Sequence, residues 1–449
     1  MLRIARITLT ALATLSGAAP RAGHTGMMLT AAEDVHELLA AAHGAPVALC
    51  ALAARAVGNF GWGAWTDAPA TPLPRRETPG ARRERREDLP VEDQRFLLDS
   101  LSTSDACVRE LAIRLLATQE SDVVAAGLEQ RLTASDSSLR AVAALGLGLS
   151  EPKSAVDPLL HVVRDPAAGT RANAIWALGR IGDGRAVRPA TTALSDGSPL
   201  VRTAAAGALG HLDSTSAIPA LVRILRDDPV ANVRRTAAWA LGQLEAKQAA
   251  EGLAASLRSD KDPAVREMSA WALGNIDDPT SGTALLTAAK GDSDDAVREM
   301  AVWAVAEHGD NAMADGVGQL LSTERSPKVR RTAAWALGQL GPRSAPKGLI
   351  DALGDNDADL RLRSAWALSE IGDGTAIPAL RTALSKEQDA KARKAEIRAL
   401  IHSGERAEQL TALLESKDPE VREAAIRGIA GHRGVDPWPW PQPRPRPFP

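Results

Sequence analysis

Apolar residues recur along most of the chain at the spacing of one helix face. Between Val233 and Leu244 they also occupy Ala237, Ala240 and Leu241. These positions follow an i, i+4, i+7, i+8, i+11 pattern, which places them on one side of an α-helix. Because similar stretches return upstream and downstream, the pattern predicts a series of amphipathic helices.

A second, shorter amphipathic run lies between consecutive copies of this pattern. Examples are SAIPALVRIL at residues 216–225 and TAIPALRTAL at residues 375–384. Gly-Asp-Gly at residues 182–184 and 372–374 supplies a glycine that can end one helix and an aspartate that can cap the next. The chain therefore predicts pairs of antiparallel helices joined by short turns.

An arginine near the start of the longer helix occurs once per helix pair, and we call these residues the counting arginines. It recurs every 29 to 32 residues, as Arg109, Arg140, Arg171, Arg202, Arg234, Arg266, Arg298, Arg330, Arg361, Arg393 and Arg422. A repeat of this length is typical of stacked helical units, in which each unit packs on its neighbours. We predict an all-α protein, a right-handed α-solenoid (superhelix) of about eleven helix pairs.

The fullest copies of the longer helix carry a recognisable phrase. VRRTAAWALGQL stands at residues 233–244 and 329–340, VREMSAWALGNI at 265–276, and TRANAIWALGRIG at 170–182. These residues resemble the HEAT repeat in its short bacterial form, which is named for phycobilisome lyases, and the resemblance covers residues 91–433. It implies the solenoid fold but no single function, because the architecture serves lyases, hydroxylases, transport receptors and scaffolds.

The first residues have the features of an export signal. Arg3 and Arg6 precede an apolar run and a group of small residues, so we expect a signal peptide at residues 1–22 and a periplasmic or secreted protein. A start at Met27 or Met28 would instead leave the protein in the cytoplasm. No later stretch approaches the roughly 20 apolar residues of a membrane span.

The remaining segments outside the repeats differ in composition. We expect an N-terminal helical cap at residues 23–66, a charged, proline-containing linker at 67–90 and a Pro/Trp-rich extended tail at 434–449. The two cysteines, Cys50 and Cys107, lie among apolar helical neighbours. They are either small buried hydrophobic residues or, in an exported protein, the two halves of one disulfide.

Motifs for catalysis are missing from the sequence. There is no glycine-rich phosphate loop and no G-x-S-x-G turn. His36-Glu37 lacks the second histidine four residues on that a zinc-hydrolase helix needs, and His43 comes too late. Deoxyhypusine hydroxylase, an iron enzyme of similar repeats, carries four His-Glu steps, whereas His36-Glu37 stands alone. We expect no catalytic residue, metal site or cofactor; a phycobilisome-lyase or hydroxylase type of enzyme is the alternative.

A tryptophan recurs at the same place in the longer helix of six repeats, and Gly207 takes this place in the repeat between Trp176 and Trp239. The row consists of Trp176, Trp239, Trp271, Trp303, Trp335 and Trp366. On a helical wheel this position lies opposite the apolar face, together with Arg235, Thr236 and Gln243. We therefore expect the rings to point away from the core and to line a concave surface. Arg114 and Leu145 take the position before the row, and Arg398 and Arg427 take it after the row.

The charges beside the tryptophans bear on the kind of partner. Arg235, Glu267, Glu299 and Arg331 each stand four residues before a tryptophan. These mixed signs, and a net charge of −3, disfavour a nucleic acid. Aromatic anchors with a charged rim fit a protein or peptide groove. We therefore predict a non-enzymatic scaffold with a protein or peptide partner on this strip; the other interpretation is that the rings only stack on neighbouring helices.

The counting arginines could be taken for a basic ladder that binds anions. Each follows a turn that carries aspartate, such as Asp262 before Arg266 and Asp294 before Arg298. Guanidinium groups pair well with carboxylates and with free carbonyl oxygens. We predict a structural ladder that ties neighbouring repeats through aspartates and turn carbonyls.

Overall fold

The computed structural model of the protein describes residues 32–46, 49–50, 53, 89–276, 278–405, 410–417 and 419–430. Regular structure in these ranges is helical throughout, without a strand. The chain divides into two compact parts, Met1–Ala208 and Leu209–Pro449. Our predictions of an export signal, of most of the linker and of the tail lie outside the described residues.

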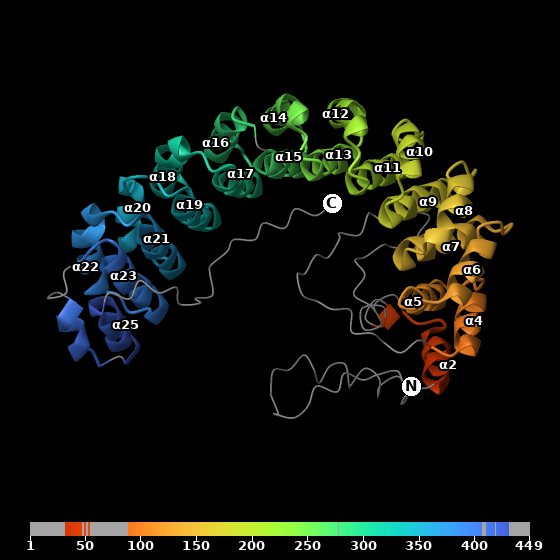
Figure 1. Ribbon diagram of the computed structural model, residues 1–449, viewed down its shortest axis with the longest axis horizontal. Helices are drawn as coiled ribbons and strands as arrows, with labels where there is room; N and C mark the ends of the chain where they lie inside the picture. The colour runs from red at the N-terminus through yellow and green to blue at the C-terminus, as the bar shows by residue number, and fades with distance from the viewer. Residues whose placement is uncertain are drawn as a thin grey trace. The chain divides into compact units, whose positions relative to one another are not determined.

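In the N-terminal part, short first helices alternate with longer second helices from residue 91 onward (Figure 1). The α-helices are α2 (Ala32–Ala42), α4 (Val91–Ser100), α5 (Ala106–Leu116), α6 (Asp122–Arg131), α7 (Ser137–Ser150), α8 (Val156–Val162), α9 (Ala168–Ile181), α10 (Val187–Ala193) and α11 (Pro199–His211), within which the division between the two parts falls. Single 3-10 turns, η1 (Lys153–Ala155) and η2 (Gly184–Ala186), lead into α8 and α10.

The C-terminal part continues the same alternation. Its α-helices are α12 (Ile218–Asp227), α13 (Ala231–Gln243), α14 (Ala250–Ser259), α15 (Pro263–Asn275), α16 (Ser281–Gly291), α17 (Asp295–His308), α18 (Ala314–Thr323), α19 (Pro327–Leu340), α20 (Lys347–Asp351), α21 (Ala358–Ile371), α22 (Ile377–Leu384), α23 (Ala390–His402) and α25 (Pro419–Ile429). Its 3-10 turns are η3 (Thr215–Ala217), η4 (Lys247–Ala249), η5 (Asn311–Met313), η6 (Ala352–Gly354), η7 (Gly374–Ala376) and η8 (Ala412–Glu415).

Within the C-terminal part the two kinds of helix form two layers. The second helices α13, α15, α17, α19, α21 and α23 pack side by side, each against the next. The first helices α12, α14, α16 and α18 lie behind them, on the outer side of the curve of this part (Figure 1). Each second helix therefore has three neighbours, and only its inner side is left uncovered.

The predicted turn chemistry is confirmed. Gly182 and Gly372 adopt φ angles of 77° and 68° at the ends of α9 and α21, a left-handed conformation that costs glycine no steric strain. Asp183 accepts a hydrogen bond from the backbone N–H of Arg185 at the start of η2. These contacts end one helix and begin the next.

The predicted core face of α13 is also confirmed, but the helix buries a wider surface than predicted. Val233, Ala237 and Ala240 are fully buried, as expected. Thr236 and Ala238, which lie off the predicted face, are fully buried as well. A second helix is covered on three sides, so a single apolar stripe underestimates what it buries.

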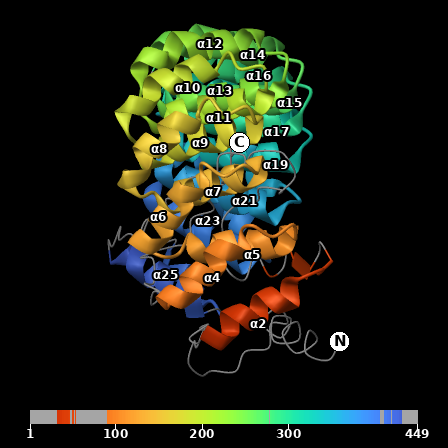
Figure 2. The same cartoon turned by 90° about the vertical axis from the view of Figure 1, so that its right-hand side faces the viewer.

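At the N-terminal end, α2 packs against α5 (Figure 2). The ring of His36 stacks on Phe96 with 3.7 Å between centroids, and the His43 ring lies 3.4 Å from the Asp105 carboxylate. Cys50 and Cys107 form a disulfide. Of the two interpretations of the cysteines, the structure therefore has the bridge, which ties the segment after α2 to α5.

Candidate functional site

The tryptophan row does not point outward as a whole, so that expectation is wrong for four of its six members. Trp176 is 1% exposed, Trp239 5%, Trp335 6% and Trp366 7%. Trp271 and Trp303 are partly exposed. The row therefore contains two kinds of tryptophan, those with a buried ring and those with a partly exposed ring.

The buried rings fill the space between consecutive second helices. A Cβ built on Gly148 of α7 would lie 2.5 Å from Cζ3 of Trp176 on α9. The same relationship joins other glycines to the tryptophan of the following repeat, with distances of 3.0 Å for Gly210 and Trp239, 2.7 Å for Gly242 and Trp271, and 2.5 Å for Gly338 and Trp366. In these four pairs, a glycine three residues after the tryptophan position of one repeat makes room for the tryptophan of the next.

A cation–π contact covers one of the buried rings. The guanidinium of Arg180 lies 5.8 Å from the ring centroid of Trp176, which stands four residues before it on the same helix. His211 meets Trp239 edge to face at 5.0 Å. Arg180 near the end of α9 and His211 at the end of α11 therefore contact the buried rings of Trp176 and Trp239.

Three positions of each central second helix form a stripe, which we call the inner stripe. It comprises a tryptophan and the residues four before and four after it, which share one helix face. On α13, α15, α17 and α19 the stripe reads Arg235-Trp239-Gln243, Glu267-Trp271-Asn275, Glu299-Trp303-Glu307 and Arg331-Trp335-Gln339. The first position is partly exposed in all four helices and the last is exposed in all four.

Ring exposure follows the residue at the first position of the stripe. Trp239 and Trp335, which follow an arginine, are buried, whereas Trp271 and Trp303, which follow a glutamate, are partly exposed. The long apolar stem of arginine can cover neighbouring apolar surface that the shorter glutamate leaves open. The two accessible rings thus lie on adjacent helices, each beside a carboxylate.

The predicted charged residues are brought close to one another along the stripe. Burial lowers the pKa of Arg235, against the attraction of Glu267. Burial raises the pKa of Glu267; the charge of Arg235 opposes this shift, and the charges of Asp294 and Glu299 add smaller contributions in the same direction as burial. The carboxylates of α15 and α17 therefore act on one another electrostatically.

The charges of Arg331 and Glu299 in this row are partly neutralised by other residues. Arg331 donates two hydrogen bonds to Asp357, of 2.7 and 3.0 Å, and its guanidinium lies 3.4 Å from Asp359. Glu299 accepts a hydrogen bond of 3.3 Å from the Thr332 hydroxyl. Glu307 has no hydrogen-bond or ion-pair partner among the described residues, and burial raises its pKa. The charge of Arg363 on α21 also acts on Glu299, so Glu307 is the stripe carboxylate of α17 without a partner among the described residues.

In the helices before and after the tryptophan row, not all residues at the tryptophan position are exposed. Arg114 is 7% exposed and pairs with Glu110, and Leu145 is 6% exposed. Arg398 lies 3.3 Å from Glu370, and Arg427 lies 2.6 Å from Glu423. Polar residues at this position therefore form local ion pairs.

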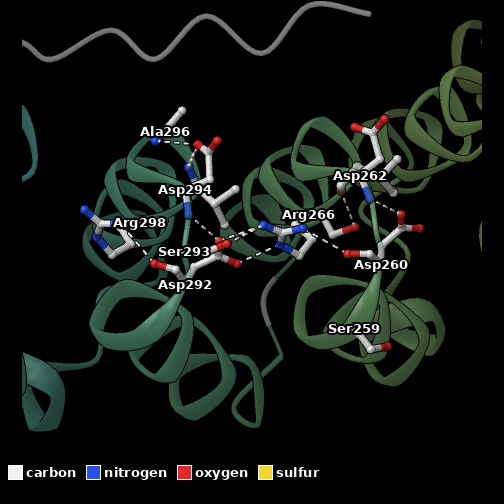
Figure 3. A network of polar contacts seen from close by, with 12 residues as sticks. Ser259, Asp260, Asp262, Arg266, Asp292, Ser293, Asp294, Ala296 and Arg298 are labelled. Carbon is white, nitrogen blue, oxygen red and sulfur yellow. Dashed lines mark hydrogen bonds and ion pairs between the residues drawn. The ribbon is translucent and has the colours of Figure 1, made fainter.

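The counting arginines form the predicted structural ladder (Figure 3). Arg266 donates two hydrogen bonds of 2.8 Å to Asp292 of the next repeat and one of 3.0 Å to the carbonyl of Asp260 in its own turn. Asp292 also accepts from the backbone N–H of Asp294 at 2.9 Å. Equivalent pairs are Arg140–Asp165, Arg171–Asp196, Arg234–Asp260, Arg298–Glu324, Arg330–Asp355 and Arg361–Glu387. These arginines are occupied within the fold.

Sequence reasoning missed a buried carboxyl on α23. Glu396 is fully buried, and neither of its carboxyl oxygens has a hydrogen-bond partner. Burial, and then the charge of Glu387, raise its pKa to about 8, while Arg361 and Arg393 act in the opposite direction. An alignment of the repeats could have found it, because the same position holds Ala301 in α17.

Groups that could hold a metal are not assembled in the described residues. No cluster of three or more His, Cys, Asp or Glu side chains has suitable geometry there. His36 and His43, the histidines nearest to a metal motif in the sequence, contact Asp93 and Asp105 at 3.5 and 3.4 Å. Among the described residues, no helix is long and apolar enough to cross a membrane.

Two solved structures are similar to this chain at low sequence identity. One, described as "Crystal Structure of Engineered Protein", is 21% identical over 78% of this chain and 100% of that chain, with a TM-score of 0.38. Another contains Kap95p, whose binding is described as inducing the switch loops of RanGDP to adopt the GTP-bound conformation. It is 14% identical, covers 76% of this chain and 56% of that chain, and has a TM-score of 0.51. At this identity the likeness bears on the fold alone.

The sequence itself establishes the family. A comparison with curated proteins gives no match. The family model for HEAT repeats matches residues 125–191, 156–242, 224–306 and 314–401, which together make up more than half of the chain. The helix pairs, their period and the arginine ladder agree with that match, and the chain belongs to the HEAT repeat family.

Proposed function

We propose that this HEAT repeat protein is a non-enzymatic scaffold that binds a protein or peptide partner on the inner stripe of α13, α15, α17 and α19. The observation that carries the proposal is the partial exposure of Trp271 and Trp303, because most rings of the row are buried. Partly exposed tryptophans beside charged groups are the residue types that dominate binding energy in protein interfaces. The buried rings, such as Trp239, hold the repeats together and position the accessible ones.

A capture experiment with the full chain tests this proposal. Extracts of the source cells are passed over the tagged wild type and over a Trp271→Leu/Trp303→Leu variant, and the retained proteins are compared by mass spectrometry. We expect the variant to lose partners that the wild type retains. A matched control is Glu251→Ala/Arg258→Ala on α14, whose exposed side chains lie in the outer layer. If the tryptophan variant and the α14 control both retain the same proteins as the wild type, the proposal is wrong.

A second variant protects the test against loss of folding. Trp271 also covers Gly242, so its replacement could loosen the contact between α13 and α15. Asn275→Lys/Glu307→Lys changes the exposed ends of the stripe and leaves both rings in place. It should interfere with partner binding while the circular dichroism and the melting temperature stay near those of the wild type.

We also propose that the protein works in an oxidising compartment, the periplasm or the cell exterior. Two features support this, the disulfide between Cys50 and Cys107 and the signal-like residues 1–22. Disulfides persist in such compartments and are rare in the cytosol. The test is alkylation of the protein in intact cells before lysis. Both cysteines should resist the reagent, and labelling of both without reduction would contradict the proposal.

A further inference from the structure

The inner stripe differs from helix to helix in charge, although its geometry repeats. The stripe of α13 contains Arg235 and that of α19 contains Arg331, whereas α15 contributes Glu267 and α17 contributes Glu299 and Glu307. Carboxylate groups therefore occupy the middle of the surface. The two accessible tryptophans lie on these same central helices.

The positive residues nearby offset the negative charge of the middle only in part. Arg331 pairs with Asp357 and Asp359, and Arg235 is attracted to Glu267. On α17, Glu299 is attracted to Arg363 of α21, whereas Glu307 has no hydrogen-bond or ion-pair partner among the described residues. A surface of this kind repels anions and attracts cations, because opposite charges across an interface set its selectivity.

Trp303 has a carboxylate on each side along its helix. Glu299 precedes it by four residues and Glu307 follows it by four, so all three lie on one helix face. A cation placed over the face of an indole is attracted by the electrons of the ring, and nearby carboxylates add direct charge attraction. Trp271, with Glu267 before it, offers a similar arrangement on the neighbouring helix.

We propose that the surface of Trp271, Trp303, Glu267, Glu299 and Glu307 binds cationic side chains, lysine or arginine, of an extended segment of a partner protein. This inference rests on the proposed function, since it specifies the chemistry of the partner. It assigns Trp303 and its two carboxylates to one cationic side chain, and Trp271 with Glu267 to another. The repeat spacing then selects segments with more than one basic residue.

The experiment uses the full chain and defined peptides. Binding of fluorescein-labelled hexa-arginine, hexaglutamate and a neutral Gly-Ser hexapeptide is measured by fluorescence anisotropy at two salt concentrations. We expect hexa-arginine to bind and the other two peptides to bind about tenfold more weakly or not at all, with weakening at the higher salt concentration. Equal binding of hexaglutamate and hexa-arginine would overturn the proposal.

Two triple variants of equal charge change locate the site. Glu267→Gln/Glu299→Gln/Glu307→Gln alters the inner stripe. Glu251→Gln/Asp315→Asn/Glu415→Gln removes three exposed carboxylates elsewhere. The first should weaken hexa-arginine binding about tenfold. The second should change it less than about twofold, because distant surface charges are screened by salt. Equal weakening by both would show an effect of net charge alone and would overturn the proposal.

A single substitution tests the contribution of the ring. Trp303→Leu keeps an apolar side chain and should weaken hexa-arginine binding by about two- to fivefold, as loss of an exposed cation–π contact predicts. Failure of the cationic chemistry can be told apart from failure of the proposed function. If captured partners depend on Trp271 and Trp303 but not on the three glutamates, the scaffold function stands and the cationic inference is wrong.

Discussion

The indole of Trp176 occupies the space that a side chain at Gly148 would need. A Cβ at Gly148 would lie 2.5 Å from Cζ3 of the ring and 2.8 Å from Cα of Ala177. The ring cannot move away easily because Trp176 is 1% exposed and enclosed by neighbouring helices. Gly148 stands three residues after the tryptophan position of its own helix. Glycine is a poor helix former, and the space that Trp176 of the next repeat needs explains why it is found there.

Gly148→Ala should therefore destabilise the protein despite the better helix propensity of alanine. We expect a loss of about 1–3 kcal/mol, the usual cost of adding a methyl group to a packed interface. Gly291→Ala is the matched control, because nothing lies within 4 Å of the position of its Cβ. It should leave the stability unchanged or raise it by up to about 1 kcal/mol. Urea denaturation measures both, and equal effects would contradict the packing relationship.

The helices could be predicted from the sequence, but the orientation predicted for four of the six tryptophans is wrong. The 3.6-residue periodicity and the helix caps, such as Asp183 after Gly182, depend on residues that are close together in the chain. They can therefore be recognised in the sequence alone. The orientation of Trp239 depends on the second helices on both sides of α13, which a wheel drawn for one helix does not include. The wheel therefore predicted an exposed ring where the structure has one that is 5% exposed.

The arginine ladder, in contrast, could be predicted because its partners repeat with the arginines. Arg266 and Asp292 are 26 residues apart, and the equivalent pairs in other repeats are 25 or 26 residues apart. Glu396 breaks the repeat, because it is buried at a position where α17 has alanine, and only an alignment of the repeats could have singled it out. Regular positions of a repeat protein are thus easier to infer than the exceptions.

Arg266→Lys tests whether the ladder stabilises the stack. Lysine cannot reproduce two parallel hydrogen bonds to Asp292 and a third to the Asp260 carbonyl. We expect a loss of about 1–3 kcal/mol in the free energy of unfolding. Arg185→Lys is the control, because the Arg185 side chain is 55% exposed in its pair with Asp157, and exposed ion pairs contribute little to stability. Equal losses would mean that the ladder adds nothing beyond a surface ion pair.

The ladder carboxylates should make the protein sensitive to acid. Burial of Asp292 opposes its ionisation, but hydrogen bonds from Arg266 and from the N–H of Asp294, with the charges of Arg266 and Arg298, outweigh it and lower its pKa. Its contribution to stability is therefore present above the ordinary pKa of an aspartate and is lost as the pH falls. Asp292→Asn should flatten this part of the stability curve. An unchanged slope below pH 4 would refute the assignment.

Glu396 should have the opposite effect of pH. Its pKa is about 8 in the folded protein, against an ordinary value of 4.5, so the folded state keeps a proton that the unfolded state releases between these values. The stability should fall as the pH rises from 4.5 to 8 and then level off. In Glu396→Gln this fall, about 1.4 kcal/mol for each pKa unit, should disappear, whereas Glu251→Gln should keep it. Parallel curves for Glu396→Gln and the wild type would contradict the buried carboxyl's role.

Site-specific photo-cross-linking in the source cells tests most directly whether the inner stripe binds a partner. A photoreactive residue at Asn275, the exposed end of the stripe on α15, is compared with one at Ala255, an exposed position of α14 in the outer layer. We predict a cross-linked product with another protein from position 275 and none from position 255. No product from position 275, or equal products from both positions, would contradict a binding surface on the inner stripe.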